Sequence, residues 1–175
     1  MQNLNDGENK MASEYAVLMR LGGFVGSNPE ILNSYPSLSM KQDESNELLA
    51  KSFPHGVHEG DFVEDKHGKY NILSYIFRVK RKEDRDDLYS FSVLLSKKDK
   101  TEVYKPILEE LIHILHQNSL LTEQILMENH KNLFEGINQE MDIEINGIKI
   151  ELQDRFKEIK NQVLKPKPEL KGSFF

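Results

Sequence analysis

The chain has 175 residues, of which 38% are hydrophobic and 30% are charged, and it contains no cysteine. These proportions are typical of globular proteins, and a chain of this length can bury a core of its own. The lack of cysteine excludes disulfides, thiolate catalysis and thiolate metal ligands. The net charge of −6 disfavours nucleic acid as a partner, because phosphate binding requires clustered Lys and Arg.

No apolar run approaches the roughly 20 residues that a membrane-spanning helix needs, and the N-terminus has no cleavable apolar segment. We therefore expect a cytoplasmic protein without a transmembrane segment, which reaches membranes only peripherally, through partners. Residues 1–13 are polar and lack periodicity, so we expect them to be disordered.

The first ordered elements that the sequence predicts are two strands and a short helix. Residues 15–20 carry apolar side chains on both faces, which is typical of a central strand, and residues 31–35 form a second strand closed by a proline. Asp43 or Ser45 is expected to cap a short helix, and a weak strand is expected around residues 62–63. The apolar residues of the short helix are Leu48, Leu49 and Phe53.

The next stretch carries the strongest extended pattern in the chain. Apolar residues alternate through 70–80 and 88–95, which predicts a hairpin, and the charged residues 81–87 predict an exposed loop between its strands. The alternate positions of the second strand include serines, so one face of the sheet is expected to be wet. Residues 103–115 repeat apolar side chains at helical spacing, with Pro106 in the first turn, and predict an amphipathic helix that covers the hairpin.

Three further elements are predicted after this helix. Residues 120–137 are expected to form a second helix packed beside the first, because the link between the two is short. Alternating residues around Asn146-Gly147 predict a hairpin with a type I′ turn, since both turn positions require positive φ. A last amphipathic helix is predicted at 152–164. The tail ends in Phe174 and Phe175, which belong either to a linker or to a docked segment.

Candidate catalytic and metal-binding residues are few. His113 and His116, with Glu109 one turn earlier, could chelate a metal, but they lie on the polar face of their helix and further ligands would be needed. The glycine-rich stretch 22–26 lacks the Lys-Ser/Thr ending of a phosphate-binding loop. We therefore expect an interaction domain with no catalytic set of its own, no cofactor and no metal.

The predicted order of elements resembles the longin fold, in which helices cover both faces of a five-stranded antiparallel sheet. The resemblance is strongest to the N-terminal longin domain of the nitrogen-permease-regulator-like family (second subunit), and looser to DENN-type longin modules. It rests on Pro-Glu-Ile at 29–31 and Tyr-Pro at 35–36, which look like that family's proline turn, strand and closing proline. It covers residues 15–153, although Asn28 replaces the glycine that the family prefers.

This resemblance implies an α+β fold at residues 14–153, with a longin-like five-stranded antiparallel sheet sandwiched by helices and an added C-terminal hairpin and helix. Residues 154–175 are assigned to the C-terminal helix and tail. The chain ends before the further domains of the eukaryotic members, so the resemblance fits a minimal module of archaeal type.

The resemblance also implies a function. Members of the family regulate small Ras-like GTPases of the Rag class without being enzymes of their own, in homodimers or heterodimers with other longin or roadblock subunits. Longin modules associate through the first helix and the neighbouring strand edge. The implied partner-binding residues are therefore Ile31, Tyr35, Leu48 and Leu49, and the alternative for each is ordinary core packing.

Three alternatives remain open. The first is a GTPase-activating subunit, since the family's arginine finger lies in the loop between the two central strands and Arg85 occupies a similar place. The acidic neighbours of Arg85 favour a solvated loop instead. The second is a module of membrane trafficking that recognises SNARE-like or coat-associated proteins. The third is a domain that senses a small molecule.

Overall fold

The computed structural model of the protein describes residues 13–23, 26–80 and 86–164. Predictions for Arg85, Phe174 and Phe175, and for nearly all of the N-terminal segment, lie outside the described residues. None of the described helices is long and apolar enough to cross a membrane. The elements are β1 (Ser13–Leu21), β2 (Glu30–Tyr35), α1 (Gln42–Ser52), β3 (Phe62–His67), β4 (Tyr70–Val79), β5 (Asp87–Ser96), α2 (Thr101–Gln117), α3 (Glu123–Glu128), α4 (His130–Gln139), β6 (Ile143–Ile145), β7 (Ile148–Ile150) and α5 (Gln153–Val163).

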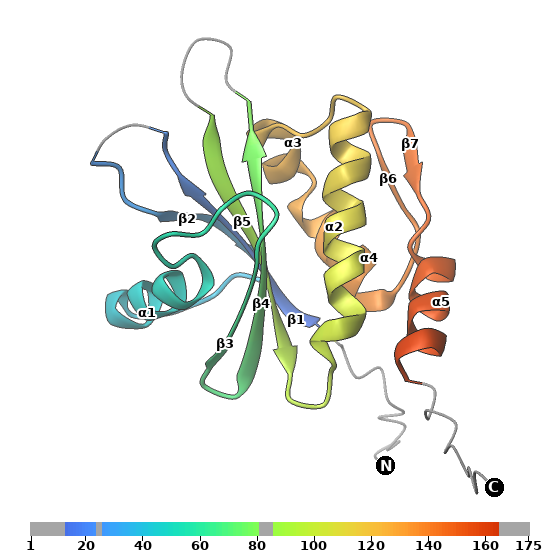
Figure 1. The fold of residues 1–175 in the computed structure, drawn as a ribbon, viewed down its shortest axis with the longest axis horizontal. Helices are drawn as coiled ribbons and strands as arrows, with labels where there is room; N and C mark the ends of the chain where they lie inside the picture. Colours follow the sequence, from blue (N-terminus) through green and yellow to red (C-terminus); the bar gives the residue numbers. More distant parts are fainter. Residues whose placement is uncertain (1–12, 24–25, 81–85, 165–175) are drawn as a thin grey trace, which may run out of the picture.

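Strands β1 to β5 form one antiparallel sheet in the order β2-β1-β5-β4-β3. Helix α1 covers one face of this sheet, and α2, α3, α4 and α5 lie on the other, together with the separate two-stranded hairpin of β6 and β7 (Figure 1). The structure therefore confirms the predicted fold class, a longin-like α+β sandwich with an added C-terminal hairpin and helix.

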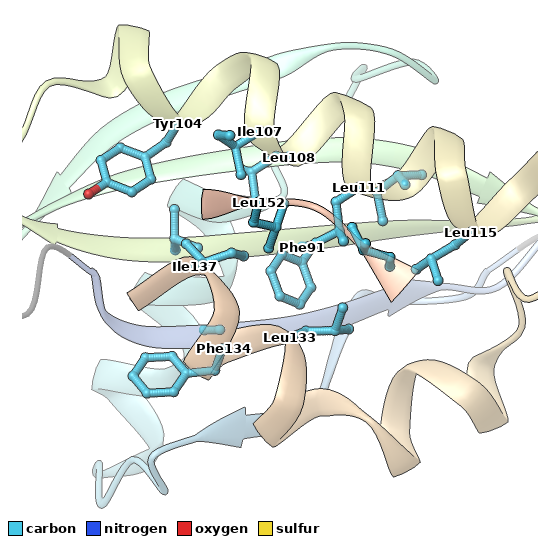
Figure 2. Packing of buried hydrophobic residues seen from close by; sticks show 14 of the residues in the cluster. Phe91, Tyr104, Ile107, Leu108, Leu111, Leu115, Leu133, Phe134, Ile137 and Leu152 are labelled. Atoms are coloured by element: carbon cyan, nitrogen blue, oxygen red, sulfur yellow. The ribbon is translucent and has the colours of Figure 1, made fainter. Parts of the chain in front are cut away.

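The larger of the two hydrophobic cores lies between the sheet and α2. Phe77 of β4 and Phe91 of β5 are each 2% exposed and belong to the same buried cluster as Ile107 and Leu111 of α2. Figure 2 shows the α2 side chains directed toward Phe91, with Leu133 of α4 on its other side. The predicted apolar faces of the central hairpin are confirmed.

The opposite face of the sheet is buried as well, so the prediction of a wet serine face is wrong. Ser74, Ser90 and Ser92 are 0% exposed. The hydroxyls of Ser74 and Ser92 share a hydrogen bond of 2.6 Å, and the Ser90 hydroxyl donates to the carbonyl of Ser52, at the end of α1, over 3.3 Å. Small hydroxyl side chains pair with one another and let α1 come close to the sheet, so water is not needed to satisfy them.

Two helix starts differ from the predictions. Helix α1 begins at Gln42 without a side-chain cap, so neither Asp43 nor Ser45 has the predicted capping role. Helix α2 begins at Thr101, which places Pro106 beyond the first turn, inside the helix. Proline has no N–H to donate, so this turn of α2 lacks one backbone hydrogen bond.

The single helix predicted at 120–137 is two helices in the structure. The Thr122 hydroxyl accepts from the Ile125 N–H over 3.2 Å and so caps the start of α3. Asn129 then leaves helical geometry, with φ −106° and ψ 11°, and separates α3 from α4. The break divides one predicted amphipathic segment into two short helices of different direction (Figure 1).

The predicted Asn-Gly hairpin is confirmed. Strands β6 and β7 pair with Ile143 opposite Ile150. Asn146 and Gly147 have φ values of 48° and 80°, the combination that a type I′ turn requires. The inward-facing isoleucines of this hairpin and Phe156 of α5 belong to the larger core, so the C-terminal elements close the side of the core that the sheet leaves open.

A buried histidine joins α4 to the sheet. His130, the first residue of α4, is 1% exposed, and its Nε2 lies 2.9 Å from the carbonyl oxygen of Ala16 in β1. Its Nδ1 is buried and has no hydrogen-bond partner among the described residues. Burial lowers the pKa of His130, and the hydrogen bond to Ala16 offsets this only in part. The ring is therefore neutral, with its proton on Nε2, where it donates to the carbonyl.

We expect His130 to make the fold sensitive to acid. Its pKa in the folded state lies below the unfolded value of about 6.5, so the unfolded chain takes up the proton first and the free energy of unfolding falls as the pH drops below about 6.5. In His130→Gln, which cannot titrate, urea unfolding between about pH 7 and pH 5 should show a smaller loss of stability. His113→Gln, which makes the same change on the exposed face of α2, is measured beside it as the control. An unchanged pH dependence in His130→Gln would contradict the assignment.

Candidate functional site

A bulge in β2 determines where the predicted partner-binding residues lie. Leu18 of β1 is opposite Asn33, but the next residue, Met19, is opposite Ile31, so Leu32 is an extra residue in β2. The alternation of faces shifts at this point. Residues on either side of the bulge that strict alternation would place on one face of the sheet therefore lie on opposite faces.

Ile31 and Tyr35 are separated in this way. Ile31 packs against the smaller core beneath α1. Tyr35 packs against the larger core on the other face, with its ring centroid 5.3 Å from that of Phe134 and the Nζ of Lys131 5.8 Å from its centroid. The structure thus brings together only part of the predicted partner-binding set.

The two leucines of α1 also differ in position. Leu48 is 0% exposed and lies in the smaller core, which is the packing role left open for it. Leu49 is partly exposed and lines a groove of about 350 Å³ together with Ile31. We call this the α1–β2 groove; its other apolar lining residues include Leu38 and Met40.

The α1–β2 groove lies at an edge of the sheet. Strand β2 is outermost in the sheet order, so its outer edge has no neighbouring strand within the described sheet. The loop that follows β2 is held by the Leu38 N–H, which donates to the Ser34 hydroxyl over 3.0 Å. An open strand edge beside a partly apolar groove is a surface to which a second protein can add.

A second groove, which the sequence analysis missed, lies between α2 and β4. Two cavities of about 550 Å³ and 560 Å³ share Glu59, Arg78, His116 and Leu121, so we treat them as one α2–β4 groove. The sequence offered one signal for this groove, because the strand predicted at 70–80 is much longer than the weak strand predicted at 62–63. Further lining residues of the groove are Tyr75, Phe77, Glu109, His113 and Arg155.

One wall of the α2–β4 groove is held by an ion pair. The Nε of Arg155, in α5, lies 2.8 Å from both carboxylate oxygens of Glu110 in α2, and its Nη2 lies 2.6 Å from Oε1. The hydrogen bonds that Arg155 donates to the Glu110 carboxylate raise the pKa of Arg155. Because both side chains are partly exposed, the pair contributes little to overall stability, but it fixes α5 against α2 beside the groove.

Tyr75 contributes a partly buried ring to the same groove. Burial raises the pKa of its hydroxyl, and the carboxylates of Glu109 and Glu59 raise it further. The ring centroid of Phe62 lies 5.0 Å away and that of Phe77 lies 6.5 Å away. Tyr75 therefore stays protonated at neutral pH and offers an apolar ring with a hydroxyl, which suits binding better than proton transfer.

The residues considered for catalysis or metal binding are placed as follows. His113, His116 and Glu109 are exposed on α2 and line the α2–β4 groove. Within residues 13–23, 26–80 and 86–164, no three His, Asp or Glu side chains converge as a metal ion would require. Arg85 is outside these ranges. Asp87, at the start of β5, is 1% exposed and accepts from the Gly23 N–H over 2.9 Å, which ties β5 to the end of β1.

Because Leu48 and Leu49 differ in burial, replacing each by alanine should lower the free energy of unfolding by different amounts. Leu48→Ala leaves a cavity in the smaller core and should lower the free energy of unfolding by about 2 to 5 kcal/mol. Leu49→Ala should lower it clearly less, because part of that side chain is already in water. Urea unfolding of both variants measures the difference. Equal losses would mean that Leu49 is a core residue and not part of a docking surface.

Known proteins offer no assignment for either groove. No protein-family model matches the chain, and no curated protein matches it in sequence. What can favour a function is therefore the fold and the geometry of the two grooves.

Proposed function

We propose that this chain is a non-enzymatic longin-type adaptor, which binds a small Ras-like GTPase of the Rag class, another longin or roadblock subunit, or both. The observation that carries the proposal is the α1–β2 groove beside the open edge of β2, on a sheet of longin-like order. In longin modules the first helix and the neighbouring strand edge serve as the association surface, and here the same two elements form a groove.

The surface offered to the partner is both apolar and firmly held. Ile31 and Leu49 present their exposed parts in the groove, and completing their burial stabilises a complex by about 25 cal/mol for each Å² of apolar surface. Leu48, beneath them, fixes α1 to the sheet. Arg20 of β1 forms an ion pair with Glu30 at the start of β2, and it also donates to Glu123 of α3 over 2.7 Å. Arg20 therefore ties β2 to β1 and to α3. A surface that is already ordered loses little entropy on binding.

Charge placed in the α1–β2 groove should prevent partner binding. Ile31→Glu and Leu49→Glu should each weaken binding to a purified Rag-class GTPase, or to a roadblock subunit, by at least about tenfold, because a carboxylate must be desolvated against an apolar surface. Ala50→Glu adds the same charge to an exposed position of α1 and is the matched control. Biolayer interferometry with the GDP and GTP forms measures the affinities.

Binding by the wild-type chain decides between the possible interpretations of this experiment. Binding to neither a GTPase nor a longin or roadblock subunit would remove the proposal. Binding to SNARE-like or coat peptides with indifference to GTPases would favour the trafficking alternative. A loss of affinity in Ala50→Glu equal to that in Leu49→Glu would place the contact on α1 outside the groove.

The GTPase-activating alternative depends on Arg85, which lies between β4 and β5 in the sequence. The pairing of β4 with β5 continues to Val79 opposite Asp87, and the buried Asp87 is anchored to Gly23. Arg85 precedes Asp87 by two positions in the sequence and itself lies outside the described residues. An arginine finger stabilises the charge that develops on the transferred phosphoryl group.

If Arg85 acts as a finger, Arg85→Ala should lower stimulated GTP hydrolysis by at least about tenfold without weakening GTPase binding. Lys82→Ala removes a positive charge from the same loop and should have little effect. Single-turnover phosphate release, with the chain in excess over the GTPase, measures the rate. A rate that Arg85→Ala leaves unchanged would exclude the finger and leave the adaptor function untouched.

A further inference from the structure

One of the two cavities in the α2–β4 groove has aromatic residues in its wall, and we call it the Tyr75 cavity. It has a volume of about 550 Å³ and is lined by Tyr75 and Phe77 of β4 and by Glu109 and His113 of α2. Sites for small molecules have volumes of about 300 to 1,000 Å³ and combine apolar walls with a few polar groups that orient the ligand. The Tyr75 cavity has the volume and both kinds of group.

The charged side chains that line the Tyr75 cavity leave one carboxylate without a partner. Both arginines of the lining are paired, because the Nε of Arg78 lies 3.5 Å from the Glu59 carboxylate and Arg155 donates to Glu110. Glu109 is exposed on α2 and forms no ion pair or side-chain hydrogen bond with another described residue. The charges of the arginines are therefore compensated within the chain, whereas the charge of Glu109 is not.

The hydroxyl of Tyr75 lies in a negative potential. Burial raises the pKa of this hydroxyl, and the carboxylates of Glu109 and Glu59 raise it further. The two carboxylates belong to different elements, since Glu109 is in α2 and Glu59 precedes β3. A negative potential beside a partly buried ring favours a positively charged ligand over a negatively charged one.

A neighbouring ring shows how this part of the protein holds an ammonium group. The Nζ of Lys105 lies 5.9 Å from the ring centroid of Phe62 and 3.1 Å from the carboxylate of Glu64. A ring and a carboxylate thus attract the same cation. The ring of Phe62 is next to that of Tyr75, with 5.0 Å between the centroids. At Tyr75 the carboxylate is that of Glu109, and none of the described lysines or arginines lies over the ring.

We propose that the Tyr75 cavity binds a small organic cation, an amine with an apolar body. The ammonium group of this ligand lies between the Glu109 carboxylate and the Tyr75 ring, and its apolar body lies against Phe77 and Leu121, which also line the cavity. The small-molecule alternative that the sequence leaves open thereby gains a location. The Tyr75 cavity is separate from the α1–β2 groove, so this proposal does not depend on the adaptor function.

Three probes with the same apolar body separate charge from shape. Phenethylammonium carries the cation, phenethyl alcohol has a neutral hydroxyl in its place, and phenylacetate has a carboxylate. We expect the amine to bind the full chain with a millimolar Kd, the alcohol to bind at least about threefold more weakly, and phenylacetate at least about tenfold more weakly. NMR titration at about pH 8, where protonated histidine does not compete, measures the affinities. The amide signals of Tyr75 and Glu109 should shift when the amine is added.

Substitutions test the carboxylate and the ring separately. Glu109→Gln removes the charge with little change in size, so it should weaken amine binding at least about threefold and leave the affinity for phenethyl alcohol unchanged. Glu102→Gln makes the same change at an exposed position of α2 that does not line the Tyr75 cavity, and it is the matched control. Tyr75→Leu removes the ring and should weaken binding of the amine more than that of the alcohol. Circular dichroism and thermal unfolding verify that each variant is folded.

Several results would overturn the proposal. These are binding of phenylacetate as tight as that of the amine, an amine affinity that Glu109→Gln leaves unchanged, and no binding of the amine at about 20 mM. A blocked peptide, Gly-Gly-Lys-Gly-Gly, distinguishes a free amine from a lysine of a partner protein, and tighter binding of this peptide would assign the cavity to a protein instead. If Tyr75→Leu does not fold, the three probes with the wild-type chain and Glu109→Gln decide the question.

Discussion

Both faces of the five-stranded sheet are apolar at its centre, and the need to cover both is the constraint on which the rest of the structure depends. In β1, Ala16 and Leu18 belong to the larger core, whereas Val17 and Met19 belong to the smaller one. One short helix covers the smaller core, and α2, α4 and the C-terminal elements cover the larger one (Figure 1). The α1–β2 groove lies between α1 and the edge strand β2, and the α2–β4 groove lies between α2 and the outer end of β4.

The parts of the fold that the sequence predicted are those that depend on neighbours along the chain. Alternation in the central hairpin placed Phe77 and Phe91 on one buried face, because strand side chains change sides at every residue. Asn146 and Gly147 specified their turn through the positive φ that both adopt. The resemblance to the longin fold then implied a five-stranded antiparallel sheet with helices on both faces, and the structure confirms that architecture.

The parts that could not be predicted depend on segments far apart in the chain. Ser90 looks exposed by residue type, and only its contact with the end of α1 makes it a buried residue. The bulge at Leu32 arises in the pairing of β2 with β1, and it moves Tyr35 to the face opposite Ile31. Of the candidate partner-binding residues, the sequence could therefore suggest the elements, whereas the pair that lines one groove, Ile31 and Leu49, is defined only by the structure.

The α1–β2 groove and the α2–β4 groove lie apart on the sheet. Strands β2 and β4 are separated by β1 and β5, and three strand spacings correspond to about 14 Å between their backbones. The α1–β2 groove opens on the face that α1 covers, whereas the α2–β4 groove lies on the α2 side of the sheet. The two grooves thus lie on different faces of one sheet. This separation supports the proposed adaptor function, because a partner in the α1–β2 groove would leave the α2–β4 groove open.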